Sequence, residues 1–80
     1  MGRAPVTSVT EFDRLWDVEY AAALAQVRAK AHLDRGVSHE LLASMRAFQQ
    51  ITGRLPTEGE VATGPAALRL RAFVADATGV

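Results

Sequence analysis

Three helix-start signals divide this 80-residue chain and limit what it can fold into. Ser8, Ser38 and Thr57 are residue types that cap helix N-termini, because their side-chain oxygens accept hydrogen bonds from free backbone N–H groups. Glu11 lies three positions after Ser8, and Glu60 lies three positions after Thr57, which is the spacing of a capping box. The sequence therefore predicts a helix directly after each of these caps.

Glycine and proline mark where the predicted helices end. Gly36 should close a first helix of about 25 residues, since glycine readily adopts the left-handed conformation of a C-terminal cap. Gly53 ends the second helix, and Pro56 marks a corner because the residue before proline avoids the helical region. Gly64 breaks a short third helix, and Pro65 suits the first turn of a fourth. We therefore expect an all-α fold, a small bundle of three to four helices.

Apolar residues recur at helical spacing and indicate the core. Trp16 should be buried, because a small domain needs its largest side chains inside. An aromatic ladder of Phe12, Trp16 and Tyr20 could also stack on bases or on a planar ligand, but the core is the favoured interpretation. On the first helix one arc holds Phe12, Trp16, Tyr20, Ala23, Leu24, Val27 and Ala31. Around Trp16 we expect Phe12, Met45, Phe48, Leu70 and Phe73.

Length and composition indicate one domain over residues 1–80, with residues 1–7 as a loose leader. The leader lacks the apolar stretch of a signal peptide, and the longest apolar run is far shorter than the roughly 20 residues that span a bilayer. We therefore expect no membrane association and a cytoplasmic location. Nine acidic and nine basic residues give a formal net charge of zero, so no overall field draws the chain to nucleic acid.

The sequence contains little that could support catalysis. It has no cysteine, which excludes disulfides, thiolate metal sites and thiol nucleophiles. His32 and His39 are separated by the break at Gly36 and should lie on different helices. Ser8 and Ser38 already serve as predicted caps. We therefore predict a non-enzymatic protein with no catalytic residues, no metal site and no cofactor.

Residues 55–74 read LPTEGEVATGPAALRLRAFV, and this stretch resembles the helix-turn-helix segments of bacterial regulators and sigma-like proteins. In that family a Pro-Thr-acid-x-Glu-Val/Ile-Ala run begins the first helix of the motif. The resemblance implies that Val61 and Ala62 pack inward and that Gly64 occupies the tight turn. It also implies that Leu70 and Phe73 anchor the second helix. The predicted bundle would then contain a helix-turn-helix-like corner.

The resemblance implies a DNA-binding regulator in which Arg69 or Arg71 contacts bases or phosphates of duplex DNA. We expect such a regulator to be a dimer. Arg54, in the corner, joins them as a candidate nucleic-acid-binding residue. The distribution of the arginines discriminates between partners. If Arg46, Arg54, Arg69 and Arg71 gather on one face, nucleic acid is favoured, and if they scatter, a protein is favoured.

The alternative function is a protein-interaction module, such as an adaptor, inhibitor or assembly subunit, because the last helix is apolar on two sides. We expect the side with Leu70, Phe73, Val74 and Ala77 to face the core. Leu68, Ala72 and Ala75 would then form a partner-binding face, occupied by a second copy in a homodimer or by another protein.

Overall fold

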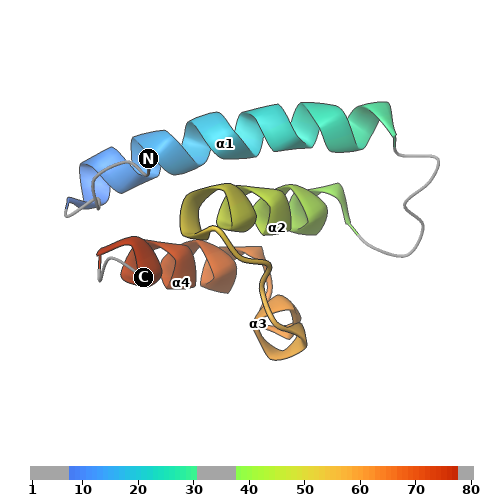
Figure 1. Ribbon diagram of the computed structural model, residues 1–80. Coiled ribbons are helices and arrows are strands. Elements are labelled where there is room, and N and C mark those ends of the chain that lie inside the picture. Colours follow the sequence, from blue (N-terminus) through green and yellow to red (C-terminus); the bar gives the residue numbers. More distant parts are fainter. Residues whose placement is uncertain (1–7, 31–37, 78–80) are drawn as a thin grey trace.

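The structure is a computed structural model, and it describes residues 8–30 and 38–77. In these residues the chain forms helices and no strands, which confirms the predicted all-α bundle. The helices are α1 (Val9–Ala29), α2 (His39–Thr52), α3 (Glu58–Ala62) and α4 (Pro65–Ala77) (Figure 1). Several predictions lie outside the described residues, namely those for the leader (residues 1–7), Ala31, His32 and Gly36.

Hydrogen bonds at the N-termini of α1, α2 and α3 confirm the three predicted caps. The Ser8 Oγ accepts a hydrogen bond from the Glu11 N–H at 3.0 Å, and the Ser38 Oγ accepts one from the Leu41 N–H at 3.1 Å. At α3, the Thr57 hydroxyl accepts from the Glu60 N–H, and the Glu60 carboxylate accepts from the Thr57 N–H.

The predicted breaks are confirmed as well. Gly53 ends α2 in the left-handed conformation, with a φ of 79°. Gly64 separates α3 from α4 and has a φ of 95°. Residues other than glycine rarely adopt this backbone conformation. Pro65 is the first residue of α4. The positive φ angles at Gly53 and Gly64 explain why glycine stands at these two breaks, and Pro65 occupies the first turn of a helix, where no N–H donor is needed.

The first helix is shorter than predicted, because α1 ends at Ala29 after 21 residues. The Lys30 N–H donates to the Val27 carbonyl at 3.1 Å, and this bond over three residues tightens the last turn. Val27 is the last buried residue of α1.

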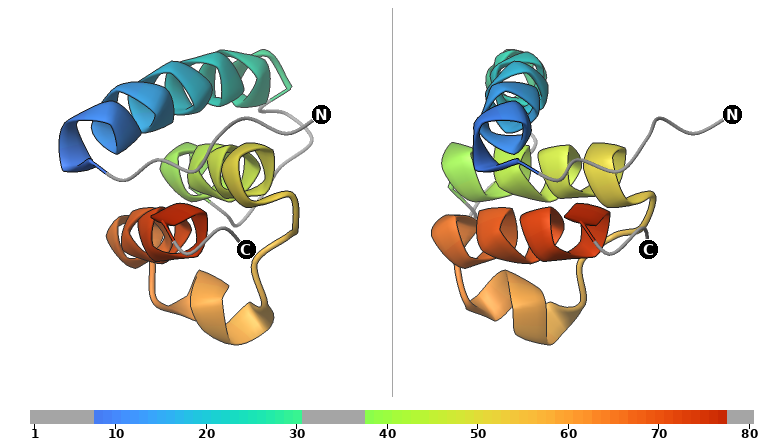
Figure 2. Two further views of the ribbon diagram at one scale, coloured as in Figure 1. Left: turned by 60° about the vertical axis from the view of Figure 1, so that its left-hand side comes forward. Right: turned by 90° about the vertical axis from the view of Figure 1, so that its left-hand side faces the viewer.

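The central helix of the bundle is α2, which lies between α1 and α4 (Figures 1 and 2). α2 and α4 lie side by side and run in the same direction, and α3 lies in the connection that returns the chain to the start of α4 (Figure 2). Small side chains on α2 allow close packing: Ala43 and Ala47 have no exposed surface. The core cluster consists of Phe12, Trp16, Ala47, Phe48, Ile51, Leu68 and Ala72.

The predicted burial of Trp16 is confirmed, since 3% of its surface is exposed. Phe12 lies 6.0 Å from it, centroid to centroid, and Phe48 belongs to the same cluster. Met45 and Phe73 were also expected around Trp16, and both are partly buried against this cluster.

The predicted orientation of α4 is wrong. Leu68 and Ala72 are fully buried, whereas Leu70 is 65% exposed and Val74 is 54% exposed. The ring of Phe73 packs edge-on against Phe12 at 5.1 Å, and this contact with α1 helps to set the rotation of α4 about its axis. Leu68 and Ala72 are one turn apart, so they share the side of α4 that belongs to the core.

No helix within residues 8–30 and 38–77 combines the length and the apolar character that crossing a membrane requires.

Candidate functional site

The most exposed apolar feature of α4 is a ridge formed by Leu70 and Val74, which we call the α4 ridge. These side chains are four residues apart and therefore lie on the same side of the helix, one turn after the other. The small residues Ala67 and Ala77 lie near them on the helix, half-buried and exposed respectively. Leu68 and Ala72 belong to the core cluster, whereas Leu70 and Val74 belong neither to it nor to the partly buried residues packed against it.

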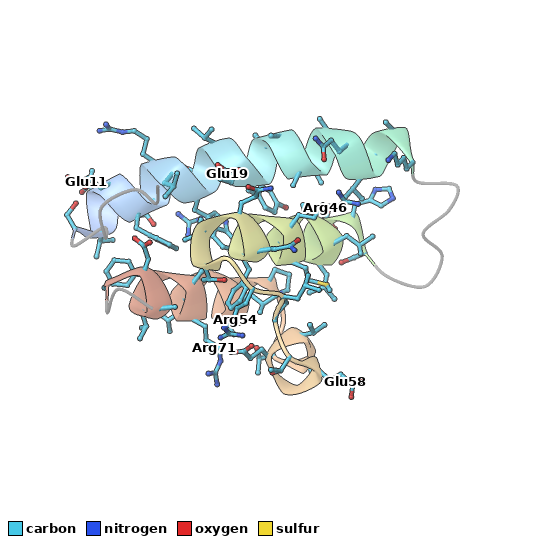
Figure 3. All side chains as sticks on the ribbon, viewed as in Figure 1. Glu11, Glu19, Arg46, Arg54, Glu58 and Arg71 are labelled. Atoms are coloured by element: carbon cyan, nitrogen blue, oxygen red, sulfur yellow. The ribbon has the colours of Figure 1, made fainter. Side chains whose placement is uncertain are left out.

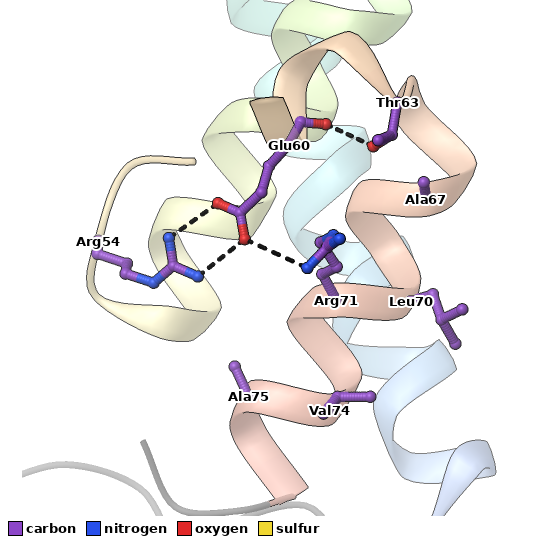
Figure 4. A pocket seen from close by; sticks show the side chains of 8 residues that line it. All are labelled: Arg54, Glu60, Thr63, Ala67, Leu70, Arg71, Val74 and Ala75. Carbon is purple, nitrogen blue, oxygen red and sulfur yellow. Dashed lines mark hydrogen bonds and ion pairs between the residues drawn. The ribbon is translucent and has the colours of Figure 1, made fainter. Parts of the chain in front are cut away.

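A hollow of about 470 Å³ borders the α4 ridge on the side of α3, and we call it the α3 hollow. Most of its wall on α4 is apolar, and its charged groups lie toward α3 and the corner before it (Figure 4). It is lined by Arg54, Glu60, Thr63, Ala67, Leu70, Arg71, Val74 and Ala75.

Glu60 holds the charged end of the α3 hollow together. Its two carboxylate oxygens accept hydrogen bonds from Arg54 at 3.0 and 3.1 Å, and one of them also accepts from the Thr57 N–H at 2.9 Å. These hydrogen bonds lower the pKa of Glu60 to about 2 from its usual value near 4.5. The bonds from Arg54 make the largest contribution, and the bond from the Thr57 N–H makes the next largest. Arg71 approaches the same carboxylate only to 3.9 Å, so its guanidinium keeps most of its hydrogen-bonding capacity.

Replacing Glu60 by glutamine should lower stability in a pH-dependent way. Since the pKa of Glu60 is lower in the folded chain, its carboxylate stabilises the fold fully above about pH 4.5, and this contribution is lost as the pH falls toward about 2. We therefore expect the difference in Tm between the wild type and Glu60→Gln to be the same near neutral pH and at about pH 5, and smaller at about pH 3. Thermal melts at these pH values measure it, and a difference that does not change with pH would contradict the assignment.

A second hollow, of about 290 Å³, borders the α4 ridge on the side of α1, and we call it the α1 hollow. Leu70 lines both hollows, so the α4 ridge stands between them. The exposed side chain of Val9 extends the apolar surface onto the first turn of α1. The lining residues are Val9, Phe12, Asp13, Ala66, Arg69, Leu70 and Phe73.

The candidate nucleic-acid-binding arginines are paired with carboxylates and do not share one face. Arg69 binds Asp13 at 2.7 Å and lies 3.6 Å from Asp17, on the side of α1. Arg54 and Arg71 meet at Glu60, between α3 and α4 (Figures 3 and 4).

Arg46 is the fourth arginine whose position was expected to discriminate between nucleic acid and protein, and it lies apart from Arg54 and Arg71 (Figure 3). It projects from α2 and lines a different hollow together with Glu19 of α1 (Figure 3). The four arginines are therefore scattered over three places on the described surface.

The corner between α3 and α4 has only part of the packing that a helix-turn-helix implies. Gly64 makes the tight turn. None of the five residues of α3 is buried: Val61 is half-buried and Ala62 is exposed, so the expected inward packing of Ala62 is wrong. The expected anchoring by Leu70 is also wrong, and Leu68 has that role instead. With five residues, α3 is too short to bury a face of its own.

The predicted partner-binding face does not exist as a surface. Leu68 and Ala72 are buried in the core cluster, and Ala75 is half-buried beside the α3 hollow. The large apolar residues that α4 exposes are instead Leu70 and Val74, which were predicted to lie in the core. The spacing of four residues between Leu70 and Val74 indicated that they share a face of the helix, but it did not indicate whether this face lies in the core or at the surface.

Among residues 8–30 and 38–77 no group of three or more acidic or histidine side chains is placed to hold a metal ion. Comparison with known proteins gives no further assignment: no protein family, no curated protein and no solved structure matches this chain.

Proposed function

We propose that this chain is a protein-interaction module that binds a helix of its partner on the α4 ridge. The observation that carries the proposal is the exposure of Leu70 and Val74 on a helix whose opposite side already supplies the core. Large apolar side chains that stand together on a surface mark interaction sites more often than single exposed ones do. The α4 ridge is such a group, and Val9 extends it across the α1 hollow.

The shape of this surface favours a helical partner. A ridge with residues four apart and a hollow on each side matches the way helices pack, with the ridges of one helix in the grooves of the other. A partner helix can place its own apolar residues, at spacings of three and four, in the two hollows. Arg54, Glu60 and Arg71 form the polar rim that borders such an interface.

Duplex DNA, the other candidate partner, has less support from the arrangement of charges. Three candidate arginines are paired with carboxylates, which weakens the field that would attract phosphates. A fluorescence anisotropy titration with duplex DNA at low salt tests this alternative. Binding that weakens with salt and is lost on changing Arg69 and Arg71 to alanine would favour DNA over the proposed function.

Site-specific photo-cross-linking in the native cell tests the interaction module. A photoreactive amino acid in place of Leu70 should give a protein adduct, and the same group in place of Val18 should not. The two residues are matched in exposure, at 65% and 62%, but Val18 lies on α1 outside both hollows. A second change, Val74→Glu, should remove the adduct at Leu70 because it places a charge in the centre of the apolar contact.

Equal cross-linking at both positions, or adducts that persist with Val74→Glu, would count against the proposed surface. Circular dichroism of the variants shows whether they stay folded. We expect that they do, since both Leu70 and Val74 are exposed and contribute little to the core.

A further inference from the structure

We infer that the partner helix is the α4 of a second copy of this chain, packed antiparallel to the first across a two-fold axis. This inference rests on the proposed function, because it names the occupant of the α4 ridge. In a two-fold interface the same surface is used on both copies, so it must be complementary to itself. The surface around α4 has both parts that this requires, a projecting ridge and a hollow on each side of it.

The spacing along α4 allows the two ridges to interlock. When the axis passes midway between Leu70 and Val74, Leu70 of each copy lies opposite Val74 of the other. Each leucine then enters a hollow beside the α4 ridge of the second copy. Ala67 and Ala77, on either side of the pair, carry only a methyl group, so the helix axes can approach to the lower end of the usual range of about 8–10 Å.

Charge complementarity favours the antiparallel direction. The range Pro65–Ala77 has no acidic residue in its first turn and no basic residue in its last turn, so its own side chains leave the helix dipole uncompensated at both ends. An antiparallel second copy places the positive end of one helix beside the negative end of the other. Arg71 then lies within about 6 Å, along the axis, of the last turn of the other α4, which favours a cation.

The state of Arg71 is consistent with that role. Its side chain is 56% exposed, and its approach to Glu60 is long, at 3.9 Å, because Arg54 already occupies the carboxylate. The chain as a whole has a formal net charge of zero, so two copies do not repel each other at long range.

A stable dimer requires that each copy cover a definite share of the surface of the other copy. A stable interface buries about 800 Å² on each partner. This is roughly 15% of the 5232 Å² that the structure exposes. The 13 residues of α4 are about 20 Å long, and the two hollows widen the contact onto α3 and onto the first turn of α1 at Val9.

Sedimentation velocity of the full chain over the micromolar range tests the assembly. We expect the wild type to sediment as a dimer, Leu70→Glu as a monomer, and the matched control Val18→Glu as a dimer, with all three equally helical by circular dichroism. A wild type that stays monomeric at every concentration would overturn the inference. The proposed function has its own readout, because a photo-adduct at Leu70 with a different protein would then leave the α4 ridge as an interaction site.

Disulfide trapping tests the direction of the helices. The chain has no cysteine, so single substitutions are specific. Leu70→Cys and Val74→Cys proteins are mixed and oxidised mildly. An antiparallel pair brings position 70 of one copy beside position 74 of the other, so the mixed disulfide should dominate over both symmetric products. If the symmetric disulfides dominate, the helices are parallel and the inference is wrong in its geometry. Val18→Cys serves as the control for random collision.

Discussion

Replacing Leu68 by glutamate is expected to unfold the chain, whereas the same change at Leu70 is expected to leave it folded. Leu68 has no exposed surface and contacts the core cluster, while Leu70 is 65% exposed. An ionised carboxylate without a partner costs several kcal/mol when it is buried. A chain of this length has a total stability of roughly 4–12 kcal/mol. The penalty is therefore comparable with the whole free energy of unfolding.

Thermal melts followed by far-UV circular dichroism check this pair of substitutions. Leu68→Met is the matched control at the buried position, since it keeps the volume apolar and should cost less than about 1.5 kcal/mol. Similar melting temperatures for Leu68→Glu and Leu70→Glu would contradict the burial of Leu68 and the exposure of Leu70.

The second large effect is expected at Trp16. It is 3% exposed, packs 6.0 Å from Phe12 and has the guanidinium of Arg69 5.9 Å above its ring. Trp16→Ala removes the largest side chain of the core cluster and leaves a cavity that the neighbouring helices can only partly fill. We expect a loss of about 3–5 kcal/mol in the free energy of unfolding.

Urea denaturation followed by circular dichroism measures the effect of Trp16→Ala, since fluorescence is lost with the only tryptophan. Val18→Ala, on the exposed side of α1, is the control and should change stability by no more than about 0.5 kcal/mol. In the wild type the tryptophan fluorescence should be that of a buried indole. A solvent-like emission from the folded protein would contradict the burial of Trp16.

The starts of the helices and the breaks at Gly53 and Gly64 were predictable because their causes are local, whereas the end of α1 was not. A cap such as Thr57 acts on an N–H group three residues away, and Gly53 and Gly64 determine their own backbone conformation. The apolar face of α1 was predictable for a related reason. Phe12 and Trp16 have polar residues opposite them, so only one orientation of α1 buries apolar surface.

The orientation of α4 was not predictable because both of its sides are apolar. Leu68 with Ala72, or Leu70 with Val74, could each satisfy a helical pattern, and the choice depends on contacts between helices. The candidate site was misplaced for the same reason.

The ion pairs also depend on tertiary structure to different degrees. Asp13 and Arg69 are 56 positions apart in the sequence, so nothing local joins them. The bond between Arg54 and Glu60 spans six positions, and the capping box at Thr57 was a local signal for the position of Glu60.

The absence of buried residues from α3 gives the two walls of the α3 hollow different mechanical properties. The wall formed by α4 is anchored in the core through Leu68 and Ala72, so it can separate from the bundle only when the bundle unfolds. The wall formed by α3 is held mainly by the Glu60 hydrogen bonds and by its caps, which water can replace. The α3 hollow can therefore widen by local opening of one short helix, and an incoming side chain can adjust its width without disturbing the hydrophobic core.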